Sequence, residues 1–322
     1  MRARVLMVAV LLSVAAAVSA DDGFLRYKWA EGLGAAYSLA FTSSGKATIG
    51  DETRAWKASW TAEVNVTIET ANAEGIADVR FKLGPMKGKQ TVVDHGDTTF
   101  DIDPEGARAV VVQDGGDPMT LEVTDELKQA LAAGFSVTMD DRGNVMSMQG
   151  NERIDTFLLG LPSMGGLPDM AGLVKVMFPI LPDKAVAEGN KWEEMAAYPM
   201  LRERLGVKVK FAWAYKGEGD VDGRACEQLG LSLKVVDQSG KLAAADNQGL
   251  AVEYHGLTVN GSGTILLSTV DTLPMAAKHQ LTQPGKMVLH AKGKDKVGGR
   301  EEDVDQRIAL EGCASTAEVK RQ

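Results

Sequence analysis

Apolar and polar residues alternate over long stretches of this chain. From Trp60 to Ile68 every second residue is apolar, and the residues between them are polar or charged. After a turn that contains Gly75, the same alternation resumes from Ala77 to Leu83. A period of two places alternate side chains on opposite faces of a β-strand. These two segments therefore predict an antiparallel hairpin with one buried face.

A second set of alternating segments occupies the C-terminal half. Apolar residues at 207, 209, 211, 213 and 215 alternate with positions that include Lys208 and Lys210. The glycine-rich stretch 217–223 predicts a turn, and residues 229–235 predict the returning strand. Residues 135–145 and 265–275 also share one plan, a strand, a turn around an aspartate and another strand. The pattern predicts a mainly β, antiparallel fold of two related units, each a curved sheet or a barrel-like structure, with a few short helices.

Helices are predicted in only three places. Thr124 is a suitable N-cap for a helix over residues 125–133, and Gly134 suits the left-handed residue that ends a helix. Residues 151–182 combine methionines with glycine, proline and leucine, and predict short amphipathic helices near 154–159 and 171–178. The predicted organisation is a signal peptide at 1–20, a first β unit at 21–150, a helical connector at 151–182 and a second β unit at 183–322.

The N-terminal residues predict export to the periplasm or the extracellular space. Arg2 and Arg4 precede an apolar run, and Val18-Ser19-Ala20 offers the small side chains that signal peptidase requires. The run is short for a membrane span, and no later apolar run reaches membrane length, so we predict no transmembrane segment.

Charge and cysteine content narrow the classes of partner. The formal net charge is −9 at pH 7, and an acidic surface repels phosphate groups, which argues against nucleic acid as a partner. Cys226 and Cys313 are the only cysteines, and both fall opposite the apolar positions of their segments. In an exported protein the two cysteines can form a disulfide or remain free thiols, and the sequence is compatible with both alternatives.

Three short motifs resemble a family of exported, β-rich bacterial proteins of unknown function. The motifs are residues 25–29 (Leu-Arg-Tyr-Lys-Trp), residues 135–145, and Leu181-Pro182 followed by residues 188–192 (Glu-Gly-Asn-Lys-Trp). Asn190 stands where the family pattern leads us to expect aspartate. The resemblance implies the β architecture and no particular activity.

Two acidic stretches raise the question of a metal or catalytic site. In Asp94-His95-Gly96-Asp97 a histidine between two carboxylates suits a metal or an oriented base, yet these residues also suit a tight turn. Asp101 and Asp103 match the opening of a calcium loop, but Val112 stands where that loop needs its closing glutamate. We predict turns at both stretches and keep their residues as weak metal candidates. His279 shares its strand parity with apolar neighbours and is predicted to face the core.

Aromatic residues and methionines suggest a different kind of site. The candidates are Trp60, Phe81, Phe211, Trp213 and Tyr215 on the predicted strands, with Met170 and Met177 in the connector. Large antiparallel sheets curve around a concave face, and methionine adapts to irregular ligands. These residues either line a site for a lipid or other hydrophobic ligand, or form a core that the connector plugs.

The functional hypothesis is a non-enzymatic exported protein, without a cofactor, that binds a hydrophobic ligand or an envelope partner. One alternative is a metal-dependent hydrolase that uses Asp94, His95 and Asp97. Another is a structural or surface interaction module.

Overall fold

The computed structural model describes residues 23–104, 108–121, 123–160, 169–197, 208–241, 250–297 and 300–322. The predicted signal peptide, Val207 and part of the connector lie outside these ranges. The strands are β1 (Gly34–Ile49), β2 (Glu52–Ala71), β3 (Ala77–Val92), β4 (Gly96–Asp103), β5 (Arg108–Gln113), β6 (Met119–Leu121), β7 (Phe135–Met139), β8 (Val145–Gln149), β9 (Lys191–Ala197), β10 (Lys208–Val221), β11 (Arg224–Lys241), β12 (Leu250–Ser268), β13 (Pro274–Val297) and β14 (Arg300–Arg321). The helices are α1 (Asp125–Ala133), α2 (Glu152–Gly160) and α3 (Met170–Met177).

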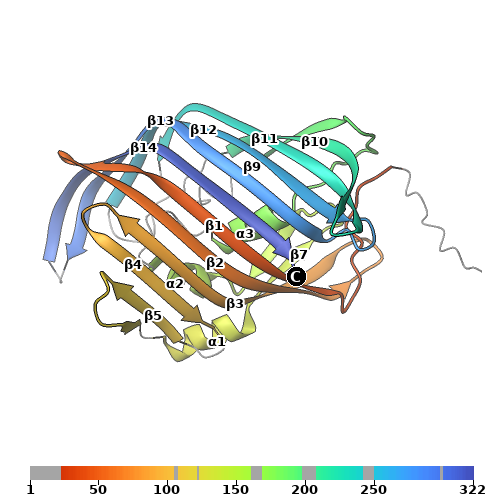
Figure 1. Cartoon of the computed structure of the whole chain (residues 1–322), viewed down its shortest axis with the longest axis horizontal. Helices are drawn as coiled ribbons and strands as arrows, with labels where there is room; N and C mark the ends of the chain where they lie inside the picture. Colours follow the sequence, from red (N-terminus) through yellow and green to blue (C-terminus); the bar gives the residue numbers. More distant parts are fainter. Residues whose placement is uncertain are drawn as a thin grey trace, which may run out of the picture.

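All fourteen strands belong to one antiparallel sheet (Figure 1). Its order is β6-β5-β4-β3-β2-β1-β14-β13-β12-β11-β10-β9, with β7 paired to β3 and β8 paired to β7. Within the described ranges β6 and β9 do not pair, so the sheet is open and curved. The predicted mainly antiparallel β class is confirmed. The strands of both predicted β units join in this one sheet, because β1 pairs with β14 at its centre.

The first predicted hairpin is confirmed as β2 and β3. Val64, Val66 and Ile68 are almost fully buried, whereas the residues between them are exposed. At the turn, the Asn72 side chain accepts hydrogen bonds from the backbone N–H groups of Glu74 and Ile76. The alternation therefore places one face of this hairpin in the core, as expected.

The second predicted hairpin is confirmed, but its turn is much shorter than predicted. β10 continues to Val221 and pairs it with Arg224, so only Asp222 and Gly223 form the turn. Both have positive φ, 52° and 76°, which suits a two-residue hairpin turn. Gly217, which the sequence placed in the turn, instead lies at a register shift within the strand pair.

The three helices form where the sequence predicted them. α1 occupies the predicted residues, and the Thr124 side chain accepts a hydrogen bond from the Leu127 N–H at 3.3 Å. Gly134 ends the helix with φ 68° and ψ −158°. This differs from the predicted left-handed conformation, because ψ lies in the extended range that only glycine readily combines with positive φ.

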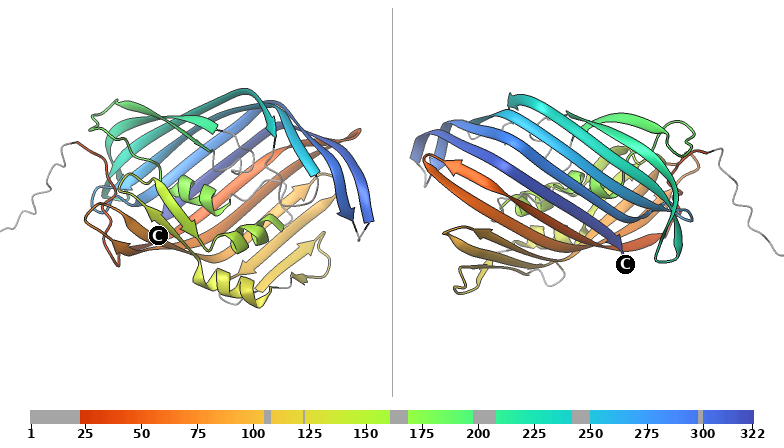
Figure 2. Two further views of the ribbon diagram at one scale, coloured as in Figure 1. Left: turned by 180° about the vertical axis from the view of Figure 1, so that it is seen from behind. Right: turned by 45° about the horizontal axis from the view of Figure 1, so that its top comes forward.

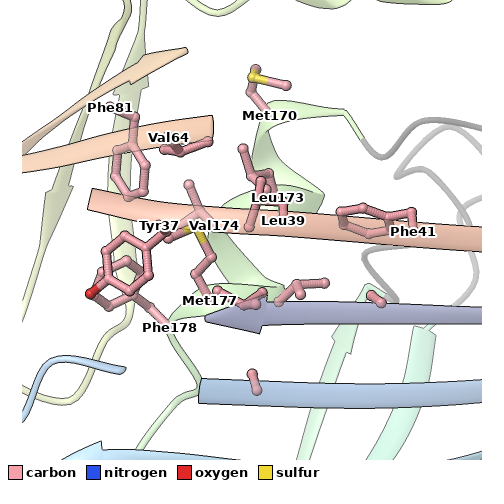
Figure 3. Packing of buried hydrophobic residues seen from close by; sticks show 14 of the residues in the cluster. Tyr37, Leu39, Phe41, Val64, Phe81, Met170, Leu173, Val174, Met177 and Phe178 are labelled. Carbon is pink, nitrogen blue, oxygen red and sulfur yellow. The ribbon is translucent and has the colours of Figure 1, made fainter. Parts of the chain in front are cut away.

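α2 and α3 lie against the concave side of the sheet (Figure 2). α3 is apolar on nearly all of its faces, and six of its eight residues are buried. Figure 3 shows Leu173 and Met177 of α3 packing against Leu39 and Tyr37 of β1. Every helix in the described part of the chain is too short or too polar to cross a membrane.

One row of directly paired residues crosses the twelve strands of the main path on the concave side. From β6 to β9 the row consists of Met119, Val111, Phe100, Gly88, Trp60, Phe41, Ala317, His279, Gly263, Leu231, Trp213 and Trp192. Aromatic residues lie on both sides of His279, and the small residues Ala317 and Gly263 are its direct neighbours. His279 contacts the backbone of α3 at Val176, so α3 crosses the row where side chains leave most room.

The predicted option of a disulfide is not realised. Cys226 in β11 and Cys313 in β14 are both free thiols. Strands β12 and β13 lie between them, and strand spacing alone therefore separates their backbones by about 14 Å. A disulfide requires Cα atoms within about 7 Å. The sequence pattern predicted neither the number of strands between the cysteines nor the side of Cys313, which pairs with Gln283 and shares the concave-side parity of Ala317.

The three family-like motifs meet at one corner of the molecule. The Tyr27 hydroxyl donates to the Pro179 carbonyl at 2.9 Å, and the Trp29 indole N–H donates to the Asp140 carbonyl at 3.1 Å. Arg26 reaches the Pro182 carbonyl at 2.6 Å. The N-terminal segment thus joins the β7–β8 turn to the chain that leaves α3. These contacts give the first motif a structural role.

Candidate functional site

The candidate site is the concave face of the sheet, which we call the inner face, together with α2 and α3. All seven aromatic and methionine residues predicted for ligand binding lie on the inner face or on the helix that covers it. They form two groups on either side of the centre of the sheet. Trp60, Phe81, Met170 and Met177 lie on the β1–β3 side, and Phe211, Trp213 and Tyr215 lie on β10.

A small apolar cavity lies between the helices and β1, β2 and β3. Leu39, Trp60, Ala62, Leu83, Met86, Leu158, Met170 and Leu173 line it, and its volume is about 10 Å³. Every lining side chain is apolar, so the cavity is dry. Half-buried Trp60 borders it and stacks on Phe41, with ring centroids 3.9 Å apart and an interplanar angle of 11°. A ligand enters this space only if side chains or helices move.

Phe81 and Met177 are core residues with no exposed surface. The Phe81 ring stacks on Phe135 at 5.0 Å and meets the edge of Phe178 at 5.8 Å. Aromatic contacts of this kind add to the free energy gained by burial. For these two residues the structure therefore favours the core interpretation over direct ligand contact.

The second group forms an aromatic cluster at the β9–β10 edge of the sheet. Trp213 stacks near Trp192 and near Phe211, with centroids 6.4 Å apart in each case. The buried indole N–H groups of Trp192 and Trp213 have no hydrogen-bond partner among the described residues. The Tyr215 side chain, unlike these two indoles, has a hydrogen-bond partner, because its hydroxyl donates to the Glu227 carboxylate at 2.5 Å.

Glu194 is a site residue that the sequence did not single out. It lies on β9 directly opposite Phe211, so its carboxyl belongs to the inner face, whereas Glu193 pairs with Lys210 on the other face. Burial raises the pKa of Glu194 to about 7, although Arg142 and Lys175 act in the opposite direction. The carboxyl therefore exchanges a proton near neutral pH. The sequence offered one signal for this: Glu194 is two residues after Trp192, so the two side chains share one face of a strand.

His279 holds α3 to the centre of the sheet. The side chain is buried, as predicted, and its Nε2 lies 3.2 Å from the Val176 carbonyl oxygen. Burial lowers the pKa of His279 to about 4, with the hydrogen bond to Val176 opposing the shift. The imidazole is therefore neutral at physiological pH, and Nε2 donates the proton to the carbonyl.

We expect His279 to make the protein sensitive to acid. Its pKa is lower in the folded than in the unfolded state, so its contribution to stability is complete above about pH 6.5 and falls as pH drops toward 4. Between pH 7 and pH 4.5, wild-type protein should lose about 2–3 kcal/mol more of its free energy of unfolding than His279→Gln. Urea unfolding at both pH values measures the difference. Equal losses in the two proteins would contradict the prediction. The raised pKa of Glu194 changes stability in the opposite direction, but Glu194 is present in both proteins and its effect cancels in the comparison.

The acidic stretches do not form a recognisable metal site. Asp94 and His95 lie in the exposed turn between β3 and β4, and Gly96 begins β4, whereas Asp97 accepts hydrogen bonds from Thr91 at 2.6 Å and from Lys89. The Lys89 hydrogen bond is the largest cause that lowers the pKa of Asp97. Within the described ranges, no three histidine, cysteine or acidic side chains gather as a metal centre would require.

The predicted turn at the calcium-like stretch begins later than expected. Asp101 and Asp103 still lie in strand β4, and the turn begins at Pro104. Asp101 lies between the buried residues Phe100 and Ile102 and is 3.4 Å from Lys87. Glu105 and Gly106 lie outside the described residues. The extended backbone of a strand keeps Asp101 and Asp103 apart along one face, so they cannot wrap around one ion as a folded calcium loop does.

Comparisons with known proteins assign no family. No protein-family model and no curated protein matches this sequence. A structure of lipovitellin, titled for its lipid–protein interactions, aligns at 11% identity with a TM-score of 0.41, covering 91% of this chain and 25% of that one. A DUF1329 family protein from Desulfovibrio piger aligns at 11% identity with a TM-score of 0.14, covering 90% and 86%. The β domain of the Bordetella autotransporter BrkA aligns at 9% identity with a TM-score of 0.21, covering 89% and 100%. This chain spans about a quarter of the lipovitellin chain, and TM-scores this low support no functional conclusion.

Proposed function

We propose that this protein is an exported, non-enzymatic binding protein that accepts a hydrophobic ligand, such as a lipid acyl chain, between the inner face and helices α2 and α3. The observation that carries the proposal is the dry apolar cavity at this boundary. Two of its lining residues are methionines, Met86 and Met170, whose flexible side chains can adopt new rotamers around a ligand. The hydrolase alternative has no comparable support, because its residues lie on an exposed turn and strand start.

The attachment of α3 explains how the cavity could enlarge. Most contacts between α3 and the sheet are apolar, and apolar contacts have no fixed direction. Two polar connections are the contact of Val176 with His279 on the sheet and the hydrogen bond from the Met170 N–H to Asp155 of α2 at 2.7 Å. An acyl chain that replaces α3 side chains buries apolar surface of the same kind, at about 0.8 kcal/mol per CH₂ group. Ligand burial therefore offsets the contacts that α3 loses.

A cavity-filling variant tests this proposal. Ala62 lines the cavity, and Ala62→Leu adds volume there, so the affinity for the fluorescent fatty acid cis-parinaric acid should fall about tenfold. The matched control is Thr61→Val on the same strand but the opposite face, which should change the affinity less than twofold. Fluorescence titration measures both affinities, and thermal unfolding checks that both variants are folded.

Two results would contradict the proposal. One is the absence of cis-parinaric acid binding by the wild-type protein, together with the absence of co-purifying lipid in mass spectra of protein from its own host. The other is equal binding by the wild type and a folded Ala62→Leu variant, which would place the ligand elsewhere.

A further inference from the structure

A larger cleft lies on the opposite, outer face of the sheet. Its volume is about 750 Å³, and it extends over β1, β2, β3, β13 and β14. Two register shifts meet there, one between Ser44 and Lys46 of β1 and one between Gln283 and Lys286 of β13. β-Bulges bend a sheet locally, and glycines at 45, 285 and 312 leave the surface without side chains. The bend and the missing side chains together hollow the outer face.

Positive charge exceeds negative charge around this cleft. Lys46, Lys57 and Lys286 line it, whereas Glu311 is the only acidic residue among the described lining residues and lies 3.5 Å from Lys286. Among the described residues, Lys46 and Lys57 have no ion-pair partner. This local excess stands out in a chain whose formal net charge is −9. Among the described lining residues, an anion at the cleft meets three lysines and one carboxylate.

The remaining lining residues supply apolar surface and hydroxyl groups. Val93 has half of its surface exposed, and Trp56 and Pro284 also border the cleft. Ser44 contributes a hydroxyl, and Ser44, Thr91 and Lys57 also line an adjoining hollow of about 380 Å³. Pockets for small molecules typically measure about 300–1,000 Å³ and combine apolar surface with a few polar groups. The cleft has this size and this combination.

We infer that the outer cleft binds an anionic amphiphile, a molecule with a phosphate or carboxylate group joined to an apolar part. Lys46 and Lys57 bind the anionic group, and Val93 and Pro284 contact the apolar part. The same chemistry occurs in a soluble aryl or alkyl phosphate and in an anionic lipid headgroup. This site is separate from the inner face, so it stands whether or not the inner face binds lipid.

The test uses charge reversal at the cleft and a matched reversal away from it. Lys57→Glu should weaken binding of 1-naphthyl phosphate about fivefold to tenfold in isothermal titration calorimetry. Lys234→Glu, an exposed lysine on β11 without an ion-pair partner among the described residues, should change it less than twofold. The neutral analogue 1-naphthalenemethanol should bind at least tenfold more weakly than 1-naphthyl phosphate. Ala62→Leu should leave naphthyl phosphate binding unchanged, which separates this site from the inner face.

A parallel measurement distinguishes the two sources of the anion. Flotation with vesicles of phosphatidylglycerol and phosphatidylcholine tests whether the cleft binds an anionic lipid headgroup. If it does, Lys57→Glu should reduce vesicle binding, whereas Lys234→Glu should leave it unchanged. Binding of naphthyl phosphate alone identifies a soluble ligand, and binding of vesicles alone identifies a headgroup. The inference is wrong if the wild type binds neither, or if Lys57→Glu and Lys234→Glu bind equally well.

Discussion

Replacing Gly134 with alanine should lower the free energy of unfolding by about 3–5 kcal/mol. Gly134 combines φ 68° with ψ −158°, a conformation that strains any residue with a Cβ atom. An added Cβ would also lie 2.1 Å from the Phe81 carbonyl oxygen. That oxygen is backbone in the centre of β3, where Phe81 is paired with both Val66 and Phe135, so it cannot move aside without breaking strand pairing.

Gly189→Ala is the matched control for this prediction. Gly189 also has positive φ, 85°, but an added Cβ would meet no atom within 4 Å. This variant should therefore show the conformational cost alone, about 1–2 kcal/mol. Urea unfolding followed by circular dichroism measures both. Equal losses for Gly134→Ala and Gly189→Ala would show that the contact with Phe81 relaxes freely.

Replacing Phe178 with alanine should cost about 3–5 kcal/mol, as removal of a buried phenylalanine generally does. Phe178 is 2% exposed and follows α3 directly. Its ring contacts Phe81 of the sheet and Tyr27 of the N-terminal segment, with centroids 5.8 Å and 5.7 Å away. The substitution therefore leaves a cavity where the helix end, the sheet and the N-terminal segment meet.

Phe24→Ala is the comparison for Phe178→Ala. Phe24 is 39% exposed and its ring lies 5.0 Å from the Arg26 guanidinium, a cation–π contact. Its loss should cost less than about 1 kcal/mol. Near-ultraviolet circular dichroism should also report weaker aromatic packing in Phe178→Ala. A cost below 1 kcal/mol for Phe178→Ala would mean that this corner of the core does not depend on its ring.

Local patterns predicted the parts of the fold that depend on local physics. Alternation identified β2, β3, β10 and β11, because each strand buries one face and exposes the other. The ends of α1 followed from Thr124 and Gly134, whose side chain and backbone satisfy the helix termini. His279 was placed in the core from its parity alone, and the structure buries it.

Other features depend on long-range pairing and were not predictable from the sequence. Asp101 and Asp103 looked like a loop because their carboxylates dominate the local composition, although Phe100 and Ile102 already showed the alternation of a strand. The separation of Cys226 from Cys313 depends on strand order, which no local pattern encodes. The outer cleft arises where bulges in β1 and β13 meet, and their meeting depends on the register of β14 between them.

The central position of the β1–β14 pair has a consequence for biogenesis. The sheet joins its two halves through β14, which a ribosome delivers after all the other described strands, and β14 has partners on both sides. Until it arrives, the long edges of β1 and β13 are unpaired and open to aggregation. Pairing across most of the chain length is also slow to form. A nascent chain of this protein should therefore depend on chaperones until β14 has been synthesised, and loss of β14 should expose two unpaired strand edges at once.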